Sequence, residues 1–279
     1  MGVAPEMKLR PDMTLRTAKP IGTFLLAMAC ACATHVVGAQ ATAQDLSADE
    51  IAKKMLRADA FAWEGAKTKL RMVLQTPDGK RQERALEVAA RRQKGLLQTM
   101  VRFQAPAEIA GTAFLMLERS GEASEQYIYL SGLKRTRRIV GREQEGSFMG
   151  SDFTYADMQR VDDKHAKNKR LPDEAVGADA CYVLETTIGE SAGSAYGKVV
   201  TWVRKSDLVA LRTKFFDKKA ALVKTLYARR VSQLEGKPVV VDARMQSANG
   251  HATELLIDAM ERRDDLPDSM FTPAALERL

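Results

Sequence analysis

Five residues near the middle of the chain have the side chains of a hydrolase site: Ser147, Ser151, Asp152, Asp157 and His165. A hydroxyl nucleophile, an imidazole base and a carboxylate together can perform acyl transfer. Catalytic groups usually converge from distant elements, however, so nearness in sequence is weak support for such a site. The sequence also lacks a phosphate-cradling glycine loop. We therefore expect that the protein is not an enzyme.

Residues that bind metals are scarce. Beyond the N-terminal segment described next, the chain contains two histidines, His165 and His251, and one cysteine, Cys181. A closed zinc site needs four such ligands at short spacings, so we expect no metal and no cofactor. His165 lies in a charged stretch and is interpreted as a solvated loop residue. His251 follows an Asn-Gly pair, which is typical of a hairpin tip, and Cys181 is interpreted as a buried thiol.

The first 43 residues have the layout of a secretory signal peptide. Four basic residues precede the apolar run IGTFLLAMACACA, and Ala41 and Ala43 form an A-x-A cleavage site. The apolar run is too short to span a bilayer as a helix, which disfavours an uncleaved anchor. Cleavage after Ala39 and lipoprotein processing at Cys30 or Cys32 are the remaining alternatives. We expect removal of residues 1–43, with cleavage after Ala43, and a protein that acts in the periplasm.

Residues 44–279 are predicted to form one exported domain. Removing the leader takes away four basic and two acidic residues, which lowers the net charge from +7 to +5. An exported protein is not expected to meet nucleic acid, and the positive charge suits an anionic membrane surface or an acidic partner protein. A single cysteine allows no internal disulfide, so the fold must depend on its core.

The hydropathy pattern predicts one helix followed by many strands. Residues 47–61 read as a helix in which Ser47 is the N-cap and Glu50 its capping-box partner. The period then changes to two, and turn residues at Pro77-Asp78-Gly79 and Ser131-Gly132 indicate hairpins. About eleven strands are expected, mostly in sequential hairpins, with a loop-rich stretch at 141–180 and a short terminal helix at TPAALERL. The fold class is mainly β, as one large antiparallel sheet with an apolar face.

A large sheet with few helices must cover its apolar face, and incomplete cover leaves a trough that can bind a ligand. Methionine and aromatic side chains suit a trough for flexible chains, because they adapt in shape. The alternative is that these residues are ordinary core under a helix. The candidate lipid-binding residues on the strands are Leu70, Met72, Leu74, Phe114, Met116, Trp202, Phe215, Val241 and Met245.

The run Lys134-Arg135-Thr136-Arg137-Arg138 places charge on both faces of a strand. Such a strand is expected at a sheet edge or a cavity rim. Arg135, Arg137 and Arg138 could contact anionic head groups or an acidic transporter surface. The alternative is a solvated edge strand that prevents aggregation.

Several stretches resemble one known family: PAEIAGTAFLMLER, YIYLSGLKRTRRI, GSFMGSDFTYADM, SAYGKVVTWVRKSDLVALRTKFFDKKAALVKTL and LPDSMFTPAALERL. They are similar to the outer membrane lipoprotein-sorting proteins, LolA-like periplasmic proteins often found beside RND or MMPL-type transporters. The resemblance implies an open half-barrel in which a curved sheet wraps around helices that cover its concave face. It also implies a cavity for the acyl chains of lipoproteins or other lipids. One departure is Leu130-Ser131-Gly132, where relatives read leucine-proline-alanine.

The stretch GSFMGSDFTYADM, residues 146–158, combines loop residues with large apolar ones. Thr154 can cap a short helix, with Asp157 at the capping-box position. We expect this segment to fold over the open side of the sheet and to insert Phe148, Met149, Phe153 and Tyr155 as a plug, which makes these four further candidate lipid-binding residues. Asp152 would accept backbone hydrogen bonds or meet an arginine of the basic run, and it is a further candidate for contact with a head group or a partner protein. The alternative is a permanently packed loop without a gating role.

These observations lead to two functional hypotheses. The first is a non-enzymatic periplasmic carrier that shields the acyl chains of lipids or lipoproteins during envelope transport. The second is an accessory module that docks to an inner-membrane RND or MMPL-type transporter without a lipid cargo. The sequence identifies neither the cargo nor the direction of transfer.

Overall fold

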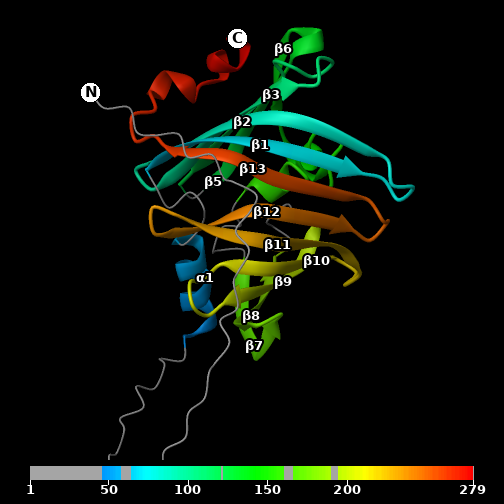
Figure 1. Cartoon of the computed structure of the whole chain (residues 1–279), viewed down its shortest axis with the longest axis vertical. Helices are drawn as coiled ribbons and strands as arrows, with labels where there is room; N and C mark the ends of the chain where they lie inside the picture. Colours follow the sequence, from blue (N-terminus) through cyan, green and yellow to red (C-terminus); the bar gives the residue numbers. More distant parts are fainter. Residues whose placement is uncertain (1–45, 58–63, 121, 160–165, 190–193, 279) are drawn as a thin grey trace, which may run out of the picture.

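The chain folds as one curved, open sheet of 13 antiparallel strands (Figure 1). The computed structural model describes residues 46–57, 64–120, 122–159, 166–189 and 194–278. The first seven elements are α1 (Ala48–Arg57), β1 (Gly65–Gln75), β2 (Arg81–Gln93), β3 (Leu96–Ala105), β4 (Ala113–Arg119), β5 (Glu122–Leu130) and β6 (Arg135–Ile139). The remaining strands are β7 (Ala166–Val176), β8 (Asp179–Ile188), β9 (Tyr196–Arg204), β10 (Ala210–Asp217), β11 (Leu222–Leu234), β12 (Lys237–Ser247) and β13 (Ala252–Arg262).

Two meanders make up the sheet. Strands β1 to β6 pair in sequence, strands β7 to β13 pair in sequence, and β1 joins the two halves by pairing with β13. The edges are therefore β6 and β7, which lie at opposite ends of the molecule (Figure 1). The chain must return from one edge to the other between residues 140 and 165, and this connection contains the predicted plug.

The strand register divides the side chains between two faces. Leu86 lies opposite Leu70 on one side and Phe103 on the other, and Val101 lies opposite Phe114. We call the face that carries these residues the inner face, and the opposite one the outer face. Because successive residues of a strand alternate between faces, the register also places Leu226 of β11 and Met245 of β12 on the inner face.

Helix α1 covers one end of the inner face. Ser47 and Glu50 form the predicted capping box: the Ser47 backbone N–H donates to Glu50 Oε2 at 2.9 Å, and the Glu50 N–H donates to Ser47 Oγ at 3.3 Å. Ile51 is fully buried against Tyr182 and Val203, so the helix packs on β8 and β9. The resemblance implied several helices over the concave face, whereas the described residues contain one α-helix, α1. The plug segment supplies the second covering element.

Most predicted turns are confirmed, and the main error concerns one strand. The β1–β2 hairpin turns at residues 76–80, and residues Ser131–Leu133 form a 3-10 turn between β5 and β6. The sequence interpretation assigned 166–176 to a loop, whereas the structure has strand β7 there. Its pattern is polar because β7 is an edge strand, and Pro172 lies where the pairing with β8 shifts register.

The C-terminal residues cross the outer face. After β13 the chain forms 3-10 turns at Asp268–Met270 and Pro273–Glu277, the second of which was predicted as a short helix. Leu266, Phe271 and Leu276 are buried against the outer side of β2 to β4.

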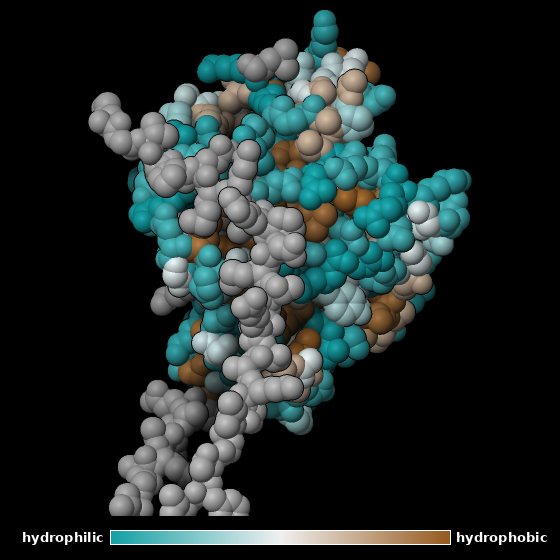
Figure 2. All heavy atoms as spheres, in the orientation of Figure 1, coloured by the Kyte–Doolittle hydropathy of each residue, from teal (hydrophilic) through white to brown (hydrophobic). Residues whose placement is uncertain are grey.

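The surface turned to the viewer is otherwise mainly hydrophilic, with separate hydrophobic patches (Figure 2). No helix among the described residues is long and apolar enough to cross a membrane.

Candidate functional site

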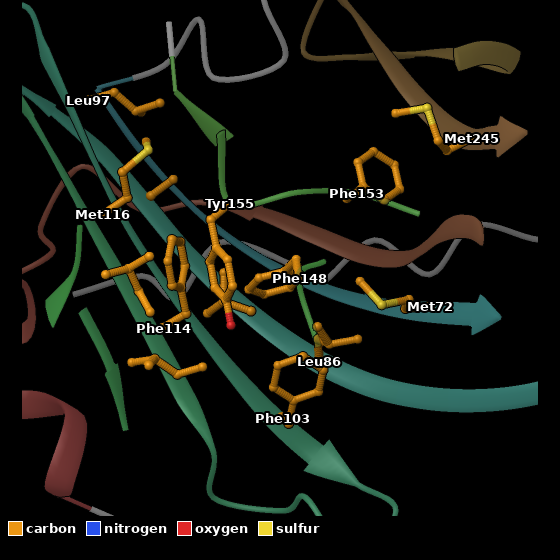
Figure 3. Packing of buried hydrophobic residues seen from close by; sticks show 14 residues of the cluster. Met72, Leu86, Leu97, Phe103, Phe114, Met116, Phe148, Phe153, Tyr155 and Met245 are labelled. Atoms are coloured by element: carbon orange, nitrogen blue, oxygen red, sulfur yellow. The ribbon is translucent and has the colours of Figure 1, made fainter. Parts of the chain in front are cut away.

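Residues 146–158, which we call the plug segment, lie on the inner face and fill its apolar centre. Phe148 is 1% exposed, and its ring lies 5.3 Å from that of Phe114 and 5.5 Å from that of Tyr155. Both contacts are edge-to-face, which is a favourable geometry for aromatic pairs. Figure 3 shows the three rings pointing toward one another above the strands. Phe153 is also buried in this cluster, so the predicted insertion of the plug is what the structure shows.

Short-range hydrogen bonds shape the plug segment. The backbone N–H of Thr154 donates to Asp157 Oδ2 at 2.7 Å, and the N–H of Asp157 donates to Thr154 Oγ1 at 3.2 Å. This is the predicted capping box, and it begins the 3-10 turn Ala156–Met158. Met149 and Gly150 both have positive φ, at 53° and 77°, and reverse the chain between Phe148 and Phe153. The sharp reversal allows both rings to point into the sheet.

Three inner-face side chains donate hydrogen bonds to backbone carbonyls of the plug segment. Arg84 of β2 binds the Met149 carbonyl, and Gln126 of β5 binds that of Tyr155 at 2.7 Å. Lys224 of β11 binds the Asp152 carbonyl at 3.0 Å. Burial lowers the pKa of Arg84, whose Nε has no hydrogen-bond partner among the described residues. Polar side chains inside an apolar cluster are costly unless they are paired, so these bonds fix where the plug sits.

A buried ion pair ties the plug segment to the second meander. Lys224 Nζ lies 2.5 Å from Asp157 Oδ2, and both side chains are only 6% exposed. The hydroxyl of Tyr196, on β9, donates to the other carboxylate oxygen at 2.9 Å. Burial and the neighbouring Asp157 charge raise the pKa of Tyr196, which keeps the phenol protonated as the donor. The ammonium also lies 5.4 Å from the ring of Phe215, a favourable cation–π distance.

Asp152 is held differently from the sequence expectation. Its carboxylate accepts hydrogen bonds from the hydroxyls of Ser247, at 2.5 Å, and Thr253, at 2.7 Å. Among the described residues, the carboxylate accepts no hydrogen bond from a backbone N–H group or from an arginine of the basic run. The cause is the topology, because the plug crosses β12 and β13 at this point and β6 lies at the far edge.

The structure brings most of the predicted lipid-binding residues together. Buried members of the inner cluster are Met72, Phe114, Met116, Phe148, Phe153, Tyr155 and Met245, with Leu70, Leu74, Met149 and Phe215 packed against it at partial exposure. Trp202 lies on the outer face, where the Arg212 guanidinium stacks 3.8 Å from its ring centre. Val241 belongs to a separate cluster with Val239 and Met260.

Sequence reasoning missed the polar residues that position the plug. Arg84, Gln126 and Lys224 each stand alone among ordinary strand residues, and only the register shows that they face inward. Leu86 and Phe103 of the same cluster were also not singled out. The alternation of β2 and β3 could have indicated the last two, because they share a face with Met72 and Phe114.

Four residues of the basic run, Arg135 to Arg138, lie in the edge strand β6, as predicted, and Lys134 ends the preceding 3-10 turn. The Arg137 guanidinium pairs with Glu143 at 2.8 Å, and Arg135 is exposed. Arg138 lies on the other face, 5.9 Å from the ring of Tyr127 and 4.0 Å from Glu125. Two of the three arginines are therefore partly neutralised by carboxylates of the same chain.

The residues considered for hydrolysis have structural partners. Ser147 Oγ donates to the Ser151 carbonyl at 2.6 Å, and Ser151 Oγ donates to the Phe148 carbonyl at 2.7 Å. His165 and the predicted signal peptide lie outside the described residues. His251 is at the β12–β13 hairpin tip and Cys181 is buried, as expected. Among the described residues, no group of three or more His, Cys, Asp or Glu side chains could hold a metal ion.

One catalytic pattern was overlooked in the sequence: residues 189–193 read G-E-S-A-G, which fits G-x-S-x-G. A nucleophile serine in this pattern needs a sharp turn from a strand into a helix. Here the stretch connects β8 to β9, which pair antiparallel, so the connection belongs to a hairpin. Residues 190–193 themselves lie outside the described part of the chain.

Comparisons with known proteins agree with the geometry. A family model described as "-like: Uncharacterized protein" matches residues 95–278, more than half of the chain. A solved domain from Vibrio parahaemolyticus, named for outer membrane lipoprotein sorting, is 28% identical with a TM-score of 0.77, over 82% of this chain and 97% of its own. A DUF1329 family protein from Desulfovibrio piger is 27% identical with a TM-score of 0.76, over 81% and 96%.

The fold class has a further parallel in a LolA superfamily protein from Nitrosomonas europaea, which is 22% identical with a TM-score of 0.65, over 81% of this chain and 98% of its own. No curated protein matches the chain. An open antiparallel sheet with a covered apolar face defines the class of LolA-like proteins. The chain is LolA-like, and it is similar to the solved outer membrane lipoprotein-sorting domain over most of its length.

Proposed function

We propose that the protein is a periplasmic carrier that binds the acyl chains of lipoproteins or other lipids against the inner face. The observation that carries the proposal is the kind of segment that covers the inner face. The centre of the apolar face is closed by a connecting loop and 3-10 turns, and not by a long helix. The plug segment is a connection and not a strand of the sheet, so it can leave the inner face without breaking any strand pairing.

The energies of the closed and loaded states can balance. The rings of Phe148, Phe153 and Tyr155 bury roughly 200 Å² each, which at about 25 cal/mol per Å² stabilises the closed state by roughly 15 kcal/mol. That cost is too large for frequent spontaneous opening. An acyl chain contributes about 0.8 kcal/mol per buried CH₂, so one long chain offers roughly 12 kcal/mol. An acyl chain can therefore offset most of the apolar part of the closed state, whereas the polar contacts of the plug oppose loading and favour release of the cargo.

The test is to lock the plug segment reversibly. Asp152 and Thr253 touch through their side chains at 2.7 Å, so Asp152→Cys with Thr253→Cys places two thiols in reach of each other. Cys181 is buried and does not compete. We expect the oxidised variant to bind a fluorescent diacylated lipopeptide at least about tenfold more weakly than its reduced form, which is the matched control. Equal binding by both forms would refute the plug as the entrance.

The accessory-module hypothesis gives a different result in the same preparation. A carrier purified from the periplasm should yield stoichiometric lipid on extraction and mass spectrometry. Protein without lipid, recovered in a tight complex with an inner-membrane RND or MMPL-type transporter, would favour the module.

A further inference from the structure

The outer face of the sheet contains a cavity that the plug segment does not reach. It has a volume of about 530 Å³ and lies on the outer face, between the central strands and the C-terminal residues 264–278. Ligand pockets for small molecules commonly measure about 300–1,000 Å³. We call this space the outer cavity.

The C-terminal residues form the roof of the outer cavity, and two arginines hold them in place. Arg91 donates to the Leu266 carbonyl at 2.8 Å, and its guanidinium lies 4.6 Å from the ring centre of Phe271. Arg102 donates to the Ala275 carbonyl at 3.0 Å. Leu276, which is fully buried, anchors the far end of this stretch. The roof is therefore fixed at several points, and the space beneath it is part of the fold.

Small and flexible side chains keep the outer cavity open. The register places Ala89 of β2 beside Met100 of β3. These two residues and Ala259 of β13 line the strand side of the cavity, which we call its floor. The roof adds Met270 and Ala275. Alanines leave space that larger residues would fill, and methionines adapt to the shape of a ligand. The lining of the cavity is thus suited to a hydrocarbon chain.

Positive charge surrounds this apolar floor. The cavity is lined by five cations, Lys67, Lys69, Arg102, Arg263 and Arg278, and by two carboxylates, Glu87 and Glu261. Arg263 is already paired with Asp265 at 2.7 Å. Within the described residues, Lys67, Arg102 and Arg278 have no carboxylate within ion-pair distance. Burial lowers the pKa of Arg102, and the nearby Glu87 charge only partly offsets that effect.

We propose that the outer cavity binds an anionic amphiphile, with its hydrocarbon chain against the alanines and methionines and its anionic head group on Lys67, Arg102 and Arg278. A fatty acid and a lysophospholipid share this chemistry, through a carboxylate or a phosphate. The site lies on the face opposite the plug segment. It is therefore separate from the proposed carrier site, and each can fail without the other.

Methionine methyl groups report on the two faces separately. Met100 and Met270 line the outer cavity, whereas Met72, Met116 and Met245 lie in the inner cluster. The experiment titrates delipidated protein, labelled with [¹³C-methyl]methionine, with dodecanoate and with lysophosphatidylglycerol, and uses uncharged monolauroylglycerol as the control ligand. We expect the Met100 and Met270 signals to shift, with about tenfold weaker binding of the uncharged ligand.

The two anionic probes identify the head group, because a response to dodecanoate alone assigns a carboxylate and a response to the lysophospholipid alone assigns a phosphate. Unmoved Met100 and Met270 signals would overturn the proposal. Shifts only at Met72, Met116 and Met245 would overturn it too, and would support the inner-face carrier site.

Two variants test the chemistry of the outer cavity. Ala259→Leu fills the floor and should weaken dodecanoate binding at least about tenfold, while Ala243→Leu on the inner face, as the matched control, should not. Lys67→Gln with Arg278→Gln changes only exposed or half-buried side chains, so the protein should fold normally. This pair should weaken dodecanoate binding about fivefold and leave monolauroylglycerol unchanged. Equal losses for both ligands, or no loss in either variant, would contradict the assignment.

Discussion

Replacing Lys224 by methionine should loosen the plug segment more than any comparable change at the surface. The substitution keeps the side-chain length but leaves Asp157 as a buried carboxylate without its ammonium partner, at a site where both side chains are 6% exposed. Removing one partner of a buried ion pair costs about 3–5 kcal/mol. The hydrogen bond to the Asp152 carbonyl is lost as well. We expect the free energy of unfolding to fall by about 4 kcal/mol, measured by urea denaturation.

The same substitution should act locally. If the loss falls on the plug segment, amide hydrogen exchange of residues 146–158 should accelerate by about 10²–10³-fold, because each 1.4 kcal/mol is a factor of ten. The matched control is Arg137→Met, which breaks the pair with Glu143. Those side chains are 42% and 51% exposed, and the expected loss is below about 1 kcal/mol.

A second substitution isolates the charge. Asp157→Asn in the Lys224→Met background removes the stranded carboxylate but keeps an oxygen for the Thr154 N–H and a polar group for the Tyr196 hydroxyl. The double variant should therefore be more stable than Lys224→Met alone, by about 1–3 kcal/mol. If the two substitutions instead destabilise additively, or if exchange accelerates equally throughout the sheet, the ion pair is not the tie that holds the plug.

Three further predictions concern the sheet that carries the plug. Burial alone would raise the pKa of Glu254, but its ion pairs with Arg244 and Arg229 outweigh burial and hold this pKa below its ordinary value of 4.5. The Glu254 carboxylate therefore stabilises the fold above pH 4.5, and this contribution is lost as the pH falls through the lower pKa of the folded state. Glu254→Gln should flatten this part of the pH–stability curve in urea titrations. Gly65→Ala places a Cβ 2.2 Å from the Arg263 carbonyl oxygen and should lower the free energy of unfolding by about 1–3 kcal/mol. The control Gly132→Ala, which has open space around it, should leave the free energy of unfolding nearly unchanged in the same assay. Burial raises the pKa of the Cys181 thiol, so iodoacetamide should label it only after unfolding, as read by mass spectrometry.

The sequence predicted the sheet well because period-two alternation and turn residues are local signals. The β1–β2 hairpin, the two capping boxes and the edge position of the basic strand all depend on residues close in sequence. The missing strand was β7, which is polar because it is an edge strand with solvent on one side. Local hydropathy cannot distinguish such a strand from a charged loop.

The candidate site was predicted only as far as its apolar half. Large apolar residues in a glycine-rich loop indicate burial whatever their partners are, so Phe148 and Tyr155 could be assigned from sequence. The partners of the polar residues depend on long-range register: Lys224 meets Asp157 from 67 positions away. Trp202 was misplaced with the apolar set for the same reason, because its face is set by pairing with β8 and β10.

The topology explains why the plug segment exists in this position. A sheet built from two meanders has its edges at β6 and β7, so the chain must cross the whole sheet once. Thirteen strands at about 4.8 Å span roughly 58 Å, and the 26 residues from 140 to 165 can reach about 85 Å when extended. The connection therefore has length to spare as it crosses the inner face. That slack is what a removable cover needs, because the plug can lift from the apolar centre while both of its ends stay in their strands.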